Sequence, residues 1–141
     1  MELNESIYKY LTSYAGLIAL ISTRVYTDQS RQDNPHVMPY LTYWKVSGTR
    51  VDTISEQSTM LFGATYQFDV FARTRHEARD VAKQLFKAFK GFKGVMGGTG
   101  GVTISAIELD GNEFSDTDRD AKTGELAFRE SQEFQIWYYE T

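Results

Sequence analysis

The segment from Ala64 to Phe92 constrains the fold most, because its side-chain pattern changes from the period of a strand to the period of a helix. Between Ala64 and Arg73 apolar and polar side chains alternate, which predicts a strand with one buried face. Thr74 then has Glu77 three residues later, the pattern of a helix N-terminal capping box. A helix with one apolar side is predicted from Arg75 to about Phe92. A chain with this unit needs a sheet and a helix that share a core.

The rest of the chain predicts further helices and strands around this unit. Apolar residues at helical spacing from Leu3 to Tyr14 predict an amphipathic helix that Gly16 interrupts, and a short second helix is expected at 17–21. Strands are expected where aromatic and β-branched residues are frequent, at 24–27, 40–47, 102–109 and 125–139. Polar loops are expected at 28–39, 48–59 and 110–124, and a flexible glycine-rich turn at 95–101.

The order of these elements, α-(α)-β-β-β-α-β-β, predicts the fold class. We expect an α+β fold in which helices pack on one face of a mostly antiparallel sheet. A length of 141 residues suits one domain, since domains usually hold about 100–200 residues. A single domain is therefore expected over residues 1–141.

Several classes of function lack support in the composition. The chain has no cysteine, which excludes disulfides, thiolate metal sites and a cysteine nucleophile. The N-terminus does not read as a signal peptide, and no apolar run approaches the roughly 20 residues that span a membrane. The two histidines, His36 and His76, have no metal-ligand or triad partner at a recognisable spacing. We therefore expect no enzyme, no cofactor, no metal site and no membrane partner.

Two motifs suggest ligand sites but fit them poorly. The glycine-rich segment 94–101 lacks the Lys-Ser/Thr of a phosphate-binding loop and follows a helix where such a loop precedes one. It is better explained as a turn that needs positive φ angles. The triplet Asp116, Asp118 and Asp120 resembles the start of a calcium loop. Ala121 and Ala127, however, occupy the positions of the required glycine and bidentate glutamate, which favours a solvated acidic loop.

Charge is distributed unevenly along the chain, although the net charge is only −4. Residues 73–93 contain seven basic and two acidic residues, a net charge of +5, and residues 94–141 contain three basic and ten acidic residues, a net charge of −7. One side of the predicted helix carries four basic residues: Arg79, Lys83, Lys87 and Lys90.

This basic helix face has three possible explanations. It can neutralise nucleic-acid phosphates, although a pI near 5.2 argues against general affinity for nucleic acid. It can instead meet the acidic segment of a neighbouring copy in a head-to-tail contact. It can also be an ordinary solvated face.

Several local strings resemble the tail-completion proteins of long-tailed bacteriophages, also called head–tail joining or tail-terminator proteins. The resemblance extends over nearly the whole chain and rests on an N-terminal helix and apolar turn followed by Arg24-Val-Tyr, and on Met38-Pro-Tyr-Leu-Thr-Tyr. It also rests on Tyr66-Gln-Phe-Asp-Val-Phe-Ala entering a helix, and on the closing Arg129-Glu-Ser-Gln-Glu-Phe-Gln-Ile-Trp. The glycine-rich turn is longer here than that family leads one to expect. None of these strings is a catalytic motif.

The resemblance implies a structural role in the virion, at the head–tail interface, after assembly in the host cytoplasm. Such proteins cap the tail tube, often as a hexameric ring, and dock to head-completion or connector proteins, and DNA passes through the ring without specific binding. On this hypothesis the four basic helix residues meet Asp116, Asp118 and Asp120 of the next copy, and Lys83→Glu weakens ring formation. The 48–59 segment, with Arg50 and Asp52, would reach a partner ring or the lumen. The alternative is a small nucleic-acid-binding or adaptor module that uses the basic helix at 75–92.

Overall fold

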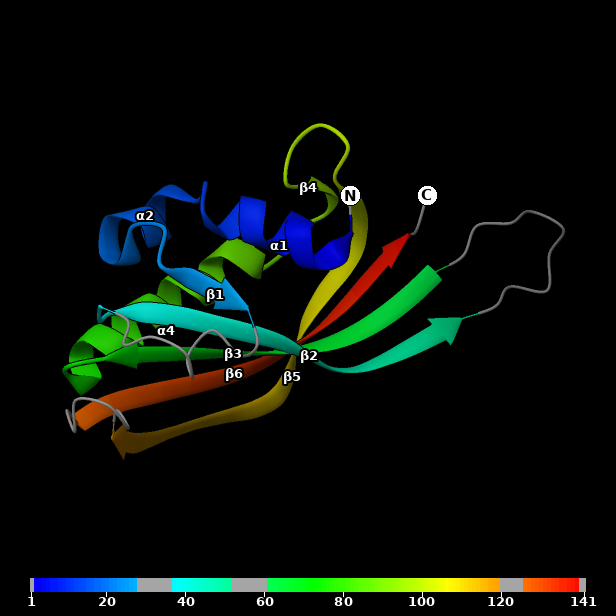
Figure 1. Cartoon of the computed structure of the whole chain (residues 1–141). Coiled ribbons are helices and arrows are strands. Elements are labelled where there is room, and N and C mark those ends of the chain that lie inside the picture. Colours follow the sequence, from blue (N-terminus) through cyan, green and yellow to red (C-terminus); the bar gives the residue numbers. More distant parts are fainter. Residues whose placement is uncertain (1, 28–36, 52–60, 120–125, 140–141) are drawn as a thin grey trace, which may run out of the picture.

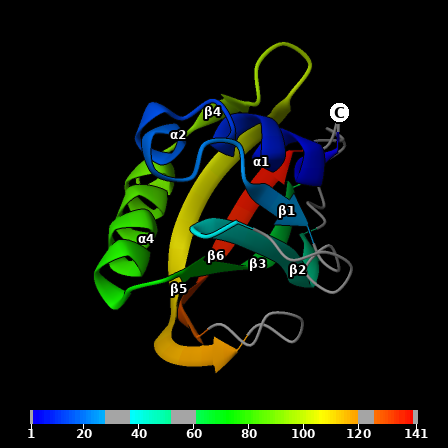
Figure 2. The same cartoon turned by 60° about the vertical axis from the view of Figure 1, so that its left-hand side comes forward.

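One twisted sheet, with helices over one of its faces, organises the molecule (Figures 1 and 2). A computed structural model describes residues 2–27, 37–51, 61–119 and 126–139, with the backbone alone described at 49–51, 111–114 and 118–119. The helices are α1 (Leu3–Leu11), α2 (Ala15–Ile21) and α4 (Arg75–Phe89). The strands are β1 (Val25–Thr27), β2 (Tyr40–Val51), β3 (Leu61–Ala72), β4 (Gly94–Met96), β5 (Val102–Arg119) and β6 (Leu126–Tyr139).

The strand order in this sheet is β1-β2-β3-β6-β5-β4. Only β1 and β2 run parallel, and every other neighbouring pair is antiparallel. The centre of the sheet is the long β3–β6 pair, whose register extends from Leu61 opposite Tyr139 to Ala72 opposite Phe128. The predicted fold class and order of elements are therefore confirmed.

Alternation along β3 places its large apolar side chains under the helices, as the sequence predicts. Tyr66, Phe68 and Val70 are buried on this face, where α4 packs on β3 and β6. Phe68 lies 5.2 Å from Phe89 of α4 and 5.7 Å from Phe134 of β6, measured between ring centroids. These rings form the centre of the core that the sheet shares with the three helices.

The opposite face of β3 is less polar than its sequence suggests. Phe71 is buried there in a second, smaller cluster with Tyr40 and Ala127. Asp69, next along this face, is only 2% exposed and accepts hydrogen bonds from Ser131 and Gln67 at 2.5 and 3.1 Å. The face that lies away from the helices therefore contains a buried carboxylate in a hydrogen-bonded network.

Hydrogen bonds from buried side chains fix α1 on the core. The Tyr43 hydroxyl donates to the backbone carbonyl of Asn4 at 2.8 Å, and the Tyr66 hydroxyl donates to Asn4 Oδ1. The Tyr10 hydroxyl donates to the carbonyl of Ala88 in α4 at 2.5 Å. Burial, together with the neighbouring Tyr14, raises the pKa of Tyr10 above its ordinary value, which favours the protonated hydroxyl that donates this hydrogen bond.

The predicted cap of α4 is present. Thr74 has an extended backbone, and its hydroxyl accepts a hydrogen bond from the Glu77 amide at 3.1 Å. This bond satisfies one of the amide groups that the first turn of a helix leaves without an intrahelical partner. The helix ends at Phe89, three residues before the predicted end, and Gly91 follows with a φ of 71°.

Replacing Thr74 with alanine should lower the free energy of unfolding by about 1 kcal/mol, because loss of an N-cap side chain costs about 0.5–2 kcal/mol. Thr74→Ser keeps the hydroxyl and should lose less than about 0.5 kcal/mol. Urea unfolding followed by circular dichroism measures both variants. Equal losses in the two variants would show that the hydroxyl is not the stabilising group.

The first helix breaks earlier than predicted, and Gly16 does not break it. α1 ends at Leu11 because Thr12 and Ser13 turn their hydroxyl groups back onto the last carbonyls of the helix, at 2.7 Å to Tyr8 and 2.9 Å to Tyr10. Gly16 lies inside α2, where an added Cβ would come within 2.3 Å of Gln84 Oε1. The glycine therefore leaves room for the side chain of Gln84 from α4.

Three predicted loops turn out to contain strand. The expected loop at 48–59 begins with the last part of β2, residues 48–51, which pair with β3. The expected turn at 95–101 begins with β4, whose first residue, Gly94, has a φ of 116°, and further positive φ angles follow β4 at Gly97, Gly98 and Gly100. The expected acidic loop at 110–124 is strand as far as Arg119, paired with β6 from Glu113 opposite Gln132 to Arg119 opposite Leu126. The register shifts between Leu109 and Glu113, at the intervening Asp-Gly-Asn. These residues have low strand propensity, and the bulge leaves them out of the regular pairing with β6. Residues 120–124 lie outside the described part of the chain.

Candidate functional site

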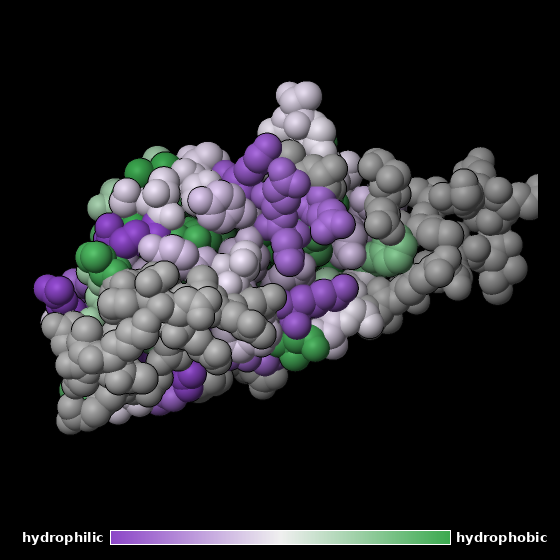
Figure 3. All heavy atoms as spheres, in the orientation of Figure 1, coloured by the Kyte–Doolittle hydropathy of each residue, from purple (hydrophilic) through white to green (hydrophobic). Residues whose placement is uncertain are grey.

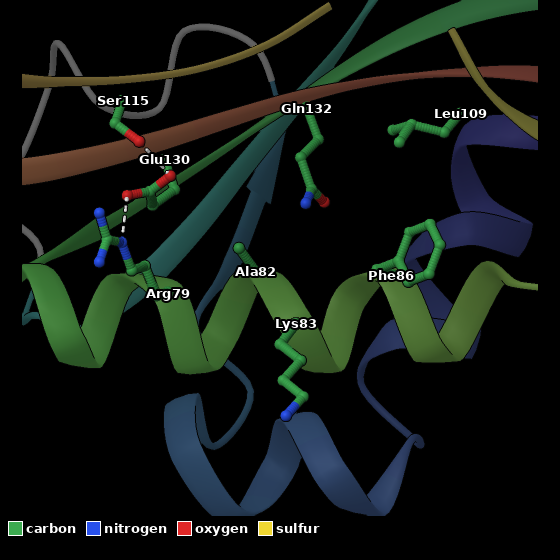
Figure 4. A pocket seen from close by; sticks show the side chains of 8 residues that line it. All are labelled: Arg79, Ala82, Lys83, Phe86, Leu109, Ser115, Glu130 and Gln132. Carbon is green, nitrogen blue, oxygen red and sulfur yellow. Dashed lines mark hydrogen bonds and ion pairs between the residues drawn. The ribbon is translucent and has the colours of Figure 1, made fainter. Parts of the chain in front are cut away.

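Of the four basic residues predicted on the helix, three lie in α4 and Lys90 is its C-cap residue, and all four are exposed. Arg79, Lys83, Lys87 and Lys90 follow one another at intervals of three or four residues, which keeps them near one side of the helix. Figure 4 shows Lys83 pointing away from the sheet, whereas Arg79 turns toward it. The structure therefore confirms an exposed basic surface but gives Arg79 a contact within the chain.

A groove lies beside this basic surface, between α4 and the neighbouring part of the sheet (Figure 4). It has a volume of about 610 Å³, and a smaller hollow of about 250 Å³ next to it shares Phe86 and Leu109 with it. The side chains of the larger groove are Arg79, Ala82, Lys83, Phe86, Leu109, Ser115, Glu130 and Gln132. The groove thus combines an apolar wall with charged side chains.

Glu130 is the main charged group in this groove, and it is buried. Its Oε2 accepts a hydrogen bond from the Ser115 hydroxyl at 2.5 Å, and its Oε1 lies 3.5 Å from Arg75 Nη1 and 3.8 Å from Arg79 Nε. The Arg75 guanidinium also covers the ring of Phe128, with 5.2 Å to the ring centroid. These contacts fix one end of α4 to β5 and β6.

Sequence reasoning did not single out Glu130, although the sequence contains a signal for it. In β6, Phe128, Phe134, Ile136 and Tyr138 share the strand phase that faces the core. Glu130 and Gln132 occupy the same phase and are buried. A polar residue at a strand position that otherwise carries core-facing apolar side chains indicates a buried polar contact.

Asp116, the predicted acidic contact residue whose side chain is described, lies on another surface. Asp116 is opposite Arg129 in register, and Arg129 Nε donates to Asp116 Oδ1 at 2.8 Å. Arg129 Nη1 also lies 3.9 Å from Asp69 Oδ2, so Asp116 belongs to the network on the face away from the helices. Asp118 is opposite Ala127, a member of the second cluster on that face.

Little or nothing is described of the remaining predicted contact residues. Arg50 lies near the end of β2, where only the backbone is described. Asp52 and Asp120 lie outside the described residues. Among the predicted acidic residues, the side chain of Asp116 is described and pairs with Arg129 instead of α4, and contact of the acidic residues with a neighbouring copy stays a prediction.

The exposed lysines beside α4 and the Asp116–Arg129–Asp69 network thus lie on opposite faces of the sheet. The α4 side has the exposed Lys83, Lys87 and Lys90, and the face away from the helices has the Asp116–Arg129–Asp69 network. A contact between the α4 side of one copy and the opposite face of the next copy therefore does not place the lysines of two copies against each other.

Exposed apolar side chains are dispersed. Those described as large and exposed are Tyr8, Ile18, Val37, Val46, Val95, Leu109 and Leu126, which belong to different elements. On the face in Figure 3, the hydrophobic residues outside the grey areas form small separate areas. Contacts made by this face therefore depend more on polar, charged and backbone groups than on one apolar patch.

The described residues contain no group of three His, Cys, Asp or Glu side chains that could hold a metal ion. No described helix is long and apolar enough to cross a membrane.

Comparison with known proteins finds similarity in fold. No protein-family model matches the chain, and no curated protein matches it in sequence. A solved structure with a similar fold is a chain of the virion of a native gene transfer agent particle, with a TM-score of 0.61 and 16% sequence identity. The match covers 95% of this chain and 92% of that one, so the two folds correspond over almost their whole length.

Proposed function

We propose that this chain is a structural protein of a phage-like virion, which caps the end of the tail tube and joins it to the head connector. The observation that carries the proposal is the agreement in fold with a virion chain over 95% of this chain. The resemblance of the sequence to tail-completion proteins supports the head–tail position within the virion. We assign the chain no reaction and no cofactor.

The mechanism in this proposal is the formation of interfaces. Each copy contacts two neighbouring copies in a ring, the tail-tube protein on one side and the head-completion protein on the other. A contact between unlike surfaces closes into a ring when the rotation between copies permits it. The resemblance favours six copies, with DNA passing through the lumen.

Location within purified particles tests this function. Gold-labelled antibodies against the chain should bind particles whose heads have been detached from their tails, at the exposed head-proximal end of the tail. Mass spectrometry of the same particles should find fewer copies of this chain than of the tail-tube protein. Label on the capsid surface, or absence of the chain from the particles, would contradict the proposal.

The exposed basic surface of α4 predicts the effect of a charge reversal. Lys83→Glu should weaken its contact about tenfold, since a charge pair at an interface is worth more than about 1.4 kcal/mol. The yield of joined particles, counted by electron microscopy, should fall accordingly, and native mass spectrometry shows whether ring formation is the step that is lost. Lys93→Glu makes the same change of charge outside α4 and should have little effect. Normal yield with Lys83→Glu would remove the charge-pairing hypothesis.

A nucleic-acid-binding or adaptor module is the second candidate, because Lys83 and Lys87 of α4 and its C-cap residue Lys90 are all exposed. Binding to phosphates releases counterions, so affinity for duplex DNA should fall steeply as salt rises. Measurable, salt-dependent binding at physiological ionic strength, lost in a variant with these lysines replaced by glutamine, would favour this candidate over the structural one.

A further inference from the structure

Both edges of the sheet contain strand that no described strand covers. β4 pairs only with Val102–Ile104, so the outer edge of β5 is bare from Ser105 to Arg119 within the described residues. At the other edge β1 pairs only with Leu41–Tyr43. Among the described residues, the outer edge of β2 is therefore bare from Trp44 to Val51. Bare edges present backbone N–H and C=O groups that can pair with another chain.

Side chains along both edges are exposed. On β2, Lys45, Val46, Ser47 and Gly48 are all exposed. On β5, Glu108, Leu109, Asp110, Ser115 and Thr117 are exposed. Each edge also has a stretch of regular register: 47–51 on β2 after its bulge, and 113–119 on β5 after its second bulge. Each edge can therefore form a ladder of several residues with a partner strand.

The charges of the two edges are complementary. The bare part of β2, residues 44–51, contains Lys45 and Arg50 and no acidic residue. The bare part of β5, residues 105–119, contains one basic residue and five acidic ones. Pairing of two β5 edges would place acidic residues against each other, whereas pairing of β5 with β2 places them against basic residues.

We propose that the bare edge of β2 in one copy pairs with the bare edge of β5 in the next copy, so that the sheet continues from subunit to subunit. This inference rests on the proposed function and names the contact that builds the ring. The two edges differ, so each copy uses one edge for each neighbour, and repetition of the contact can close a ring.

The topology also gives the direction of the pairing. Three antiparallel steps separate β2 from β5 in the sheet, so the two strands run in opposite directions. Copies that follow one another in similar orientation therefore pair them antiparallel. β1 covers the beginning of β2, and β4 covers the beginning of β5. In an antiparallel ladder of β2 with β5, the short strands β1 and β4 therefore lie at opposite ends. The middle of the ladder stays free for pairing between the two copies.

The added strand would also cover part of the groove wall. Leu109 is 37% exposed at the bare edge and lines both hollows beside α4. Directly opposed residues on one face of a sheet lie about 4.5–5.5 Å apart, which is close enough for a side chain of the neighbouring β2 to pack on Leu109. Burial of Leu109 by a second copy would explain an exposed leucine at a sheet edge.

The absence of cysteine makes site-specific cross-linking the direct test. Single-cysteine copies Ser47→Cys, Glu108→Cys and Thr117→Cys all change exposed residues. Particles are assembled from two differently tagged variants, so every cross-link between unlike tags joins two copies. A bismaleimide with a reach of about 13 Å tolerates a register shift of about four residues, since each residue advances a strand about 3.3 Å. Together, positions 108 and 117 cover the bare edge of β5.

Ser47→Cys is mixed with Glu108→Cys in one assembly and with Thr117→Cys in another. A cross-linked dimer of unlike tags is expected in at least one of these two mixtures. The control mixture pairs Ser47→Cys with Ala19→Cys, which places the second cysteine at an exposed residue of α2, an element with no part in either edge. It should give at least fivefold less of this dimer. Intact particles in which neither edge mixture cross-links above the control would overturn the edge pairing and leave the virion role standing. Absence of all variants and of the wild-type chain from particles would instead refute the proposed function.

Discussion

Replacing Phe68 with alanine should lower the free energy of unfolding by about 3–5 kcal/mol, the range for deleting a buried phenylalanine side chain. Phe68 is fully buried, and its ring centroid lies 5.6 Å from that of Tyr43 and 5.2 Å from that of Phe89. The substitution removes the ring that joins β2, β6 and α4 and leaves a cavity between them. Since domains are stable by only about 5–15 kcal/mol, this loss is a large fraction of the total.

Urea unfolding followed by circular dichroism and tryptophan fluorescence measures this loss. Tyr8→Ala is the matched control, because it removes an aromatic ring that is 42% exposed on α1. It should cost less than about 1 kcal/mol, as surface substitutions usually do. A Phe68→Ala variant that unfolds within 1 kcal/mol of the wild type would contradict the central position of this ring in the core.

Replacing Arg129 with methionine should cost about 2–3 kcal/mol, because removal of one partner leaves a buried charge uncompensated. The charge is that of Asp69, which is 2% exposed and lies 3.9 Å from Arg129 Nη1. Methionine keeps the length of the side chain but removes the hydrogen bonds to Asp116 as well. Ser131 and Gln67 remain as donors to Asp69, which limits the loss.

Two comparisons separate the charge effect from lost packing. Lys9→Met breaks the Glu5–Lys9 pair, which is exposed on both sides, and should cost less than about 0.5 kcal/mol. Asp69→Asn in the Arg129→Met background removes the uncompensated charge and should recover about half of the loss. An Arg129→Met variant as stable as wild type, measured by urea unfolding, would show that Asp69 does not depend on this partner.

Local signals in the sequence predicted the β3–α4 unit well. The strand predicted from Ala64 to Arg73 and the Thr74 cap depend on neighbouring residues, and both are present, although β3 ends at Ala72 and its second face is buried as well. The break after α1 is also local, but it arises from hydroxyl groups of Thr12 and Ser13 that compete for helix carbonyls, whereas the prediction relied on glycine. Helix propensity alone does not reveal that competition.

Long-range pairing explains what the sequence did not predict. Residues 110–119 have the composition of a loop, yet 113–119 form strand because β6 continues opposite them. Glu130 was missed because its partners Ser115, Arg75 and Arg79 come from other elements. The bare edges of β2 and β5 follow from the strand order, which a single sequence does not show.

The most direct test of the head–tail role is electron microscopy of a lysate in which an early stop codon interrupts this gene in the parent phage or particle. The account predicts DNA-filled heads separate from tails, some of irregular length, and restoration of joined particles when the wild-type chain is supplied from a plasmid. Intact, infectious particles in the absence of the chain would contradict it.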